Sequence, residues 1–149
     1  MTMNYYNCLT SNDAFFMHVE NMPKIPSAET CSNWDHVLQS LDEFYCEKAA
    51  TGTPFTLVFD IRQMSIPDTQ HIMQAVKLFG KHSDTSEHLL KETLMLLTPL
   101  GRGILDMLFT LYRPRRPVIF ASTLEELQPE QRALFRSLED RHAVVSHAL

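Results

Sequence analysis

The stretch FTLVFDI at residues 55–61 decides the fold class of this chain. It is a continuous apolar run of strand length, which is typical of a central strand buried on both faces of a sheet. Residues 93–97, TLMLL, form a second run of this kind, and residues 117–121, PVIFA, predict a third short strand. The chain is therefore expected to build a sheet whose inner strands are covered by helices.

The segments around these strands complete the prediction. Residues 4–10 and 14–21 are rich in Tyr, Phe and Val and flank the turn residues Ser11-Asn12-Asp13, which predicts a β-hairpin. Apolar side chains recur at helical spacing in further segments, at residues 34–45, 72–79, 99–112 and 129–138. The first of these helices is expected to begin at Ser32, and the polar residues 81–88 predict a surface connection.

Strands that alternate with helices imply parallel pairing through right-handed crossovers. The chain has 149 residues, a length that corresponds to one domain with one core. We therefore predict a single α/β domain over residues 1–149. It would contain a mixed, mostly parallel sheet of about five strands, with an N-terminal β-hairpin and packed helices.

Composition and charge exclude several classes of protein. The cysteines Cys8, Cys31 and Cys46 are widely spaced and form no CxxC pair, which argues against a disulfide framework and a thiolate zinc site. The net charge of −5 gives no electrostatic reason to expect nucleic acid as a partner. The most apolar stretch, residues 104–112, is too short to span a bilayer, and residues 1–8 show no secretory signal. We expect a cytoplasmic protein without a transmembrane segment.

An apolar strand ends in Asp60, and after a loop Asp68-Thr69 stands at the expected start of the next helix. These residues, the order of the elements and the segment 117–127 resemble the STAS (SpoIIAA-like) domain, the family of anti-anti-sigma factors and sulfate-transporter tails. Family members usually continue Asp-Ser-Ser-Gly, whereas this chain continues Gln70-His71-Ile72. The resemblance implies a non-catalytic binding or regulatory module that engages a protein partner, with Thr69 at the position of a phosphorylation switch.

The stretch from Leu94 to Pro114 is also similar to the SEC14, or CRAL-TRIO, lipid-binding family, in which an apolar helix follows a strand and a proline-containing turn. This second resemblance implies binding of a lipid or another apolar small ligand along the helix from Ile104. The basic residues Arg113, Arg115 and Arg116 would then meet an anionic head group. The alternative for these arginines is a solvated loop. We rank the STAS-like role first and the SEC14-like role second.

Candidate site residues follow the ends of the predicted strands, where ligands of parallel sheets gather. Asp60, Asp68 and Thr69 are candidates for partner binding, and the alternative is that Asp68 or Thr69 is simply the cap of the helix. In the turn from Thr98 to Gly103, Gly101, Arg102 and Gly103 are candidates for holding an anion at a helix start. The alternative is that the glycines permit close helix–sheet packing.

The helix after Pro99 carries more apolar side chains than one face can hold: Ile104, Leu105, Met107, Leu108, Phe109, Leu111 and Tyr112. Part of this set is expected to form core. The excess predicts the lining of a pocket, a membrane-touching face or the interface of a homodimer.

No pattern of catalytic or metal-binding residues stands out. The histidines form no HExxH motif or other tight ligand spacing, and the serines lack the context of a nucleophile elbow. His82 and His88 are expected to be exposed in the polar connection, and Cys46 is expected to be packed. The sequence therefore predicts no enzyme activity, no cofactor and no metal site.

Overall fold

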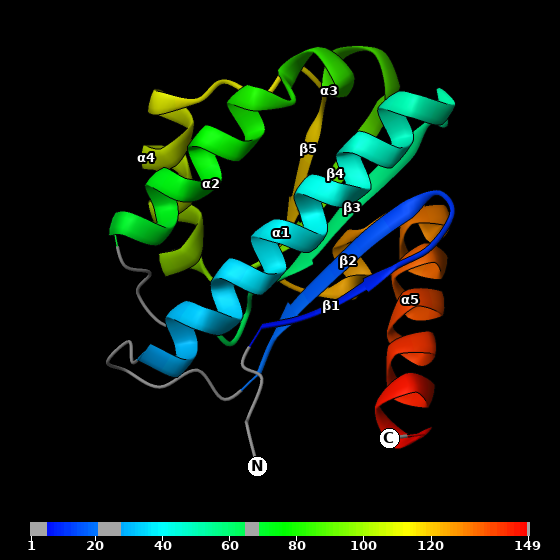
Figure 1. The fold of residues 1–149 in the computed structure, drawn as a ribbon. Coiled ribbons are helices and arrows are strands. Elements are labelled where there is room, and N and C mark those ends of the chain that lie inside the picture. Colours follow the sequence, from blue (N-terminus) through cyan, green and yellow to red (C-terminus); the bar gives the residue numbers. More distant parts are fainter. Residues whose placement is uncertain (1–5, 21–27, 65–68, 149) are drawn as a thin grey trace.

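The computed structural model describes residues 6–20, 28–64 and 69–148 of the chain. Five strands within these ranges form one sheet in sequence order: β1 (Tyr6–Thr10), β2 (Ala14–Val19), β3 (Phe55–Asp60), β4 (Leu90–Leu96) and β5 (Val118–Ala121). β1 and β2 form the antiparallel hairpin, and every later strand pairs in parallel with its neighbour. The predicted mixed, mostly parallel α/β sheet is confirmed (Figure 1).

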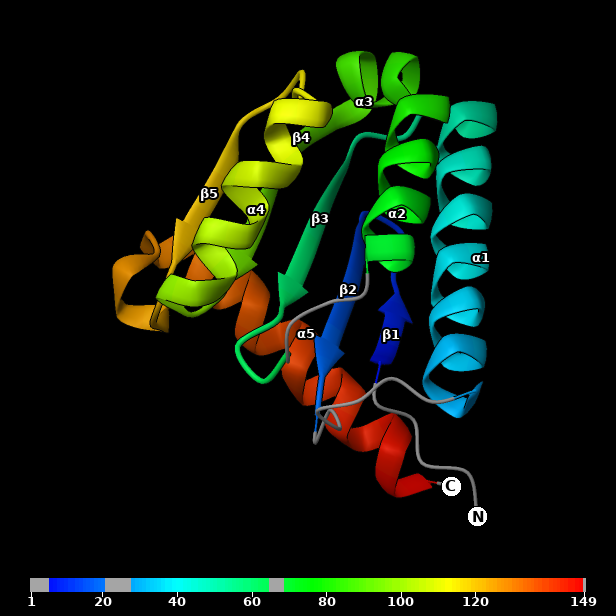
Figure 2. The same ribbon diagram turned by 90° about the vertical axis from the view of Figure 1, so that its left-hand side faces the viewer.

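The helices are α1 (Ala28–Thr51), α2 (Thr69–Lys81), α3 (Ser83–Leu89), α4 (Pro99–Leu111), the 3-10 helix η1 (Leu124–Glu126) and α5 (Pro129–Ala148). All parallel crossovers run in the same direction along the sheet. Because such crossovers are right-handed, their helices fall on the same face. α1 to α4 accordingly form one helical layer, and α5 covers the opposite face of the sheet (Figure 2).

Side chains of the inner strands alternate between two separate cores. On β2, Phe15 and Met17 face the helical layer, while Phe16 faces α5. On β3, Phe59 faces the helical layer and Val58 faces α5. Each strand buries both of its faces, which explains why its sequence is a continuous apolar run without a polar alternation.

The prediction that residues 81–88 form a polar surface connection is wrong. α2 continues through Gly80 to Lys81, and α3 occupies Ser83–Leu89. His82 lies between these helices and is buried, with 7% of its surface exposed, whereas His88 is exposed as expected. Ser86 of α3 is also buried, so a polar composition here conceals a packed helical turn.

Two further expectations need correction. α1 begins at Ala28, before the expected start at Ser32, and Cys46 on this helix is exposed, although it was expected to be packed. Thr98 caps α4, because its hydroxyl accepts a hydrogen bond from Gly101 N at 3.2 Å, and Pro99 opens the helix. Among the described residues, no helix combines the length and the apolarity that crossing a bilayer requires.

Two glycines, one after α1 and one inside α4, have different backbone conformations and should respond oppositely to substitution by alanine. Gly52 follows the helix with a φ of 68°, in the left-handed region that costs other residues about 1–2 kcal/mol. Gly103 lies inside α4, where an added Cβ would meet open space. We expect Gly52→Ala to lower the free energy of unfolding by about 1 kcal/mol and Gly103→Ala to raise it by a similar amount, about 1 kcal/mol. Urea unfolding measures both changes, and equal signs would contradict the assigned backbone.

Candidate functional site

Asp60, the first predicted site residue, is engaged by an arginine of the same chain. Arg62 donates from Nε to Asp60 Oδ1 at 3.0 Å and from Nη2 to Oδ2 at 2.9 Å. Such bidentate pairs are among the stronger side-chain contacts, and this one raises the pKa of Arg62. A partner that binds Asp60 would have to compete with Arg62.

The other two residues of that group cannot be placed beside Asp60. Asp68 lies outside the described residues, and Thr69 opens α2 with its side chain also outside them. The partner-binding edge and the phosphorylation switch that the STAS resemblance implies therefore stay predictions.

The turn from Thr98 to Gly103 already uses its polar groups within the chain. The Arg102 guanidinium lies 3.8 Å from the centre of the Phe120 ring, and its Nε donates to Asp106 Oδ1 at 3.2 Å. A Cβ on Gly101 would make only ordinary contacts, the nearest at 3.5 Å from Leu97 Cβ and from Thr98 Oγ1, and one on Gly103 would meet nothing. Close helix–sheet packing therefore does not explain these two glycines.

The basic residues Arg113, Arg115 and Arg116 lie at the opposite edge of the sheet from that turn. The turn follows the carboxyl end of β4, whereas the arginines precede the amino end of the parallel strand β5. Arg115 Nη1 donates to Glu87 Oε2 at 3.0 Å, and Arg116 Nε donates to the Leu90 carbonyl at 2.9 Å. The structure thus separates the two groups of candidate anion-binding residues.

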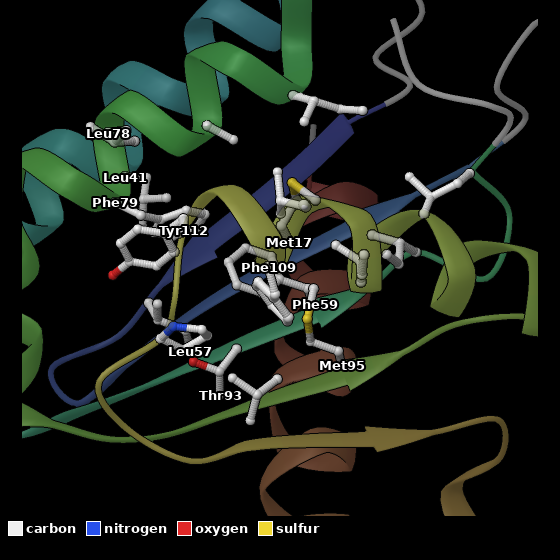
Figure 3. A pocket seen from close by; sticks show the side chains of 18 of the residues that line it. Met17, Leu41, Leu57, Phe59, Leu78, Phe79, Thr93, Met95, Phe109 and Tyr112 are labelled. Atoms are coloured by element: carbon white, nitrogen blue, oxygen red, sulfur yellow. The ribbon is translucent and has the colours of Figure 1, made fainter. Parts of the chain in front are cut away.

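A cavity of about 160 Å³ lies between the sheet and α1, α2 and α4. Apolar side chains from all three helices and from the inner strands form nearly all of its wall, among them Met17, Leu41, Phe59, Phe79, Met95 and Phe109. Figure 3 shows these side chains arranged around one space under α4. A space of this size inside a small domain is a natural binding site for an apolar molecule.

The polar groups of the wall gather at the two ends of the cavity. Near the start of β5 the wall contains Thr93, Tyr112, Arg115 and Arg116. The Tyr112 ring stacks on Phe79 with centroids 5.8 Å apart, and partial burial raises the pKa of its hydroxyl, which stays protonated at neutral pH. This end therefore offers hydroxyl donors and fixed positive charge beside an apolar chamber.

The other end of the cavity lies near the carboxyl ends of the strands. Trp34 and His71 stack there with ring centroids 5.4 Å apart, and Thr98 completes the wall. No lysine or arginine among the described residues lines this end. The two ends thus differ in charge, and the arginines mark the one near β5.

The apolar excess on α4 is divided between the cavity and the surface. Leu105, Leu108 and Phe109 line the cavity, as the pocket-lining alternative predicted. Met107 and Leu111 are 72% and 64% exposed and point away from the core. α4 therefore carries apolar side chains both on the side that faces the cavity and on its exposed side.

Comparisons with protein-family models, with curated proteins and with solved structures each found no match. The resemblances to the STAS and SEC14 families therefore stay predictions.

Sequence reasoning missed the contribution of α1 and α2 to the cavity. Leu41, Leu78 and Phe79 occur at ordinary helical spacing, and the same spacing describes a filled core. No sequence signal distinguishes the two cases, because a cavity is the space left by side chains from several elements. The apolar excess on α4 was the one available indication.

Proposed function

We propose that this protein binds a small, mainly apolar molecule in the cavity between its helical layer and its sheet. The main observation that supports this function is the cavity itself. Protein interiors are close-packed, and voids much larger than a water molecule are few. An engineered cavity of about 150 Å³ lined by Leu, Ile and Phe stays dry and binds benzene, and the cavity here is similar in size and chemistry, at about 160 Å³. The apolar-ligand alternative therefore ranks above the protein-partner role that the sequence favoured.

The cavity is partly open to solvent, so a ligand can reach its apolar wall. An apolar molecule that enters it removes apolar surface of both partners from water, which is favourable. A bound ligand would therefore stabilise the folded protein.

The arginines at one end indicate the polarity of the ligand. Arg116 lines this end of the cavity and is anchored through Nε to the Leu90 carbonyl. A guanidinium has five N–H donors and pairs well with carboxylate or phosphate. The proposed ligand therefore has an apolar body and an anionic group at the end near β5.

Thermal unfolding with a small probe tests the binding function. We expect the alcohol 3-phenylpropanol to raise the melting temperature in a saturable way, because a ligand at 100 times its Kd stabilises the folded state by about 2.7 kcal/mol. Glycerol at the same concentrations is the control, since it has no apolar body to bury. A melting temperature that stays constant or falls across the soluble range of 3-phenylpropanol would contradict the proposal.

A further inference from the structure

Three potential metal ligands meet on the outer side of the helical layer. Asp42 and Cys46 lie one turn apart on α1, and His82 approaches them from the junction of α2 and α3. One donor atom of each residue, a carboxylate oxygen, the thiol sulfur and an imidazole nitrogen, lies within 4.8 Å of the other two. None of these residues lines the cavity.

His82 is held in a fixed orientation at this cluster. Its ring stacks on Tyr45 with centroids 4.6 Å apart and an interplanar angle of 4°. Its Nε2 lies 2.6 Å from Asp42 Oδ1, and its backbone N–H donates to the Leu78 carbonyl. The imidazole is thus held by ring packing with Nε2 beside the Asp42 carboxylate.

We propose that Asp42, Cys46 and His82 form a binding site for a zinc-class divalent cation. Imidazole, thiolate and carboxylate are all ligands that Zn²⁺ accepts, and thiolate with imidazole disfavours Mg²⁺ and Ca²⁺. Three protein ligands leave a fourth tetrahedral position for water. The exposed Cys46 and the half-buried Asp42 make the site accessible from solvent.

Lys81 is the competitor for this site. Its Nζ donates to Asp42 Oδ1 at 3.0 Å, but its side chain is 62% exposed and is free to swing into solvent. Exposed ion pairs of this kind contribute little to stability, so a bound cation would displace Lys81 easily.

A second cluster, Asp84, Glu87 and His88, provides a contrast. All three residues are exposed on the single short helix α3, and Glu87 is already paired with Arg115. It has no buried ligand to fix a geometry. This cluster serves as an internal control for adventitious binding.

Binding at the first cluster would join α1 to the α2–α3 junction. Tyr45 and Ser86, which lie directly behind His82, share a hydrogen bond of 3.2 Å and line the cavity. A cation would therefore brace the helical layer that covers the cavity, and we expect it to raise the melting temperature of the protein.

Cobalt substitution tests the site with a signal specific for the thiolate. Protein stripped with EDTA and kept reduced is titrated with Co²⁺, and Zn²⁺ is then added to displace it. We expect one equivalent of Co²⁺ to produce a sulfur-to-cobalt charge-transfer band in the near ultraviolet, which Zn²⁺ abolishes. Cys46→Ser removes an exposed ligand, so it should fold normally, lose the band and weaken Zn²⁺ binding by at least about tenfold.

The controls are Cys8→Ala, a cysteine on β1 outside the cluster, and His88→Gln in the second cluster. Both are expected to keep the band and the Zn²⁺ affinity of the unmodified protein. The proposal is overturned if one equivalent of Co²⁺ gives no charge-transfer band. It is equally overturned if Cys46→Ser binds Zn²⁺ as tightly as the unmodified protein, or if His88→Gln abolishes binding.

Discussion

Replacing Ala75 with leucine is expected to raise the free energy of unfolding by about 1–2 kcal/mol and to abolish binding of 3-phenylpropanol. Ala75 lies on α2 and forms part of the cavity wall. Leucine adds three carbons that would enter the space otherwise filled by ligand. Because alanine and leucine have similar helix propensities, the gain would come from filling the cavity.

The matched control is Ala133→Leu, which makes the same change at an exposed position on α5, on the far side of the sheet. It should leave both stability and binding nearly unchanged. Urea unfolding measures the first quantity and titration calorimetry the second. If Ala75→Leu lowered the stability and kept the binding, leucine would be overpacking a filled core, and the cavity would not be the binding site.

Arg116→Gln is expected to weaken binding of 3-phenylpropionate by about tenfold or more, while binding of 3-phenylpropanol stays unchanged. The two probes have nearly the same shape, and only the first is anionic. A hydrogen bond to a charged group contributes about 1.5–3 kcal/mol, and each 1.4 kcal/mol corresponds to about a factor of ten in Kd. The difference between the probes therefore isolates the charge at the end of the cavity that Arg116 lines.

Arg113→Gln removes the same charge from a residue that is exposed like Arg116 but does not line the cavity. We expect it to leave the affinity for both probes within about twofold, because a charge outside the wall makes no direct contact with the ligand and is screened by solvent and salt. Calorimetric titrations of both variants with both probes supply the comparison. An equal loss of affinity in the two variants would indicate a general electrostatic effect and would remove Arg116 from the site.

The fold followed from the sequence because its decisive signals are local. The run FTLVFDI needs apolar neighbours on both faces, and only an inner strand of a covered sheet provides them. The end of α1 at Thr51 and the cap at Thr98 also depend on a few adjacent residues. The sequential strand order then follows from short right-handed crossovers.

The candidate site was less predictable because it depends on distances between elements. His82 belongs to a polar segment, and its burial results from Tyr45 and Asp42 on a helix far earlier in the sequence. A search for closely spaced ligands misses this cluster for the same reason. The charge of Arg115 and Arg116 was evident, but their position at one end of a cavity was not.

The most direct test of the cavity as a ligand site uses the methionine methyl groups as reporters. Met17 on β2 and Met95 on β4 line the cavity (Figure 3), and their exposed fractions are 4% and 9%. Met73 and Met107 are 40% and 72% exposed and lie outside its wall. Protein labelled with ¹³C at the methionine methyls is titrated with 3-phenylpropanol and followed by NMR.

The aromatic ring of a bound probe shifts the signals of methyl groups close to it. If 3-phenylpropanol enters the cavity, the Met17 and Met95 signals shift in a saturable way and the Met73 and Met107 signals stay in place. If Met17 and Met95 do not shift, or if Met107 shifts in their stead, the probe binds elsewhere and the proposed function is wrong.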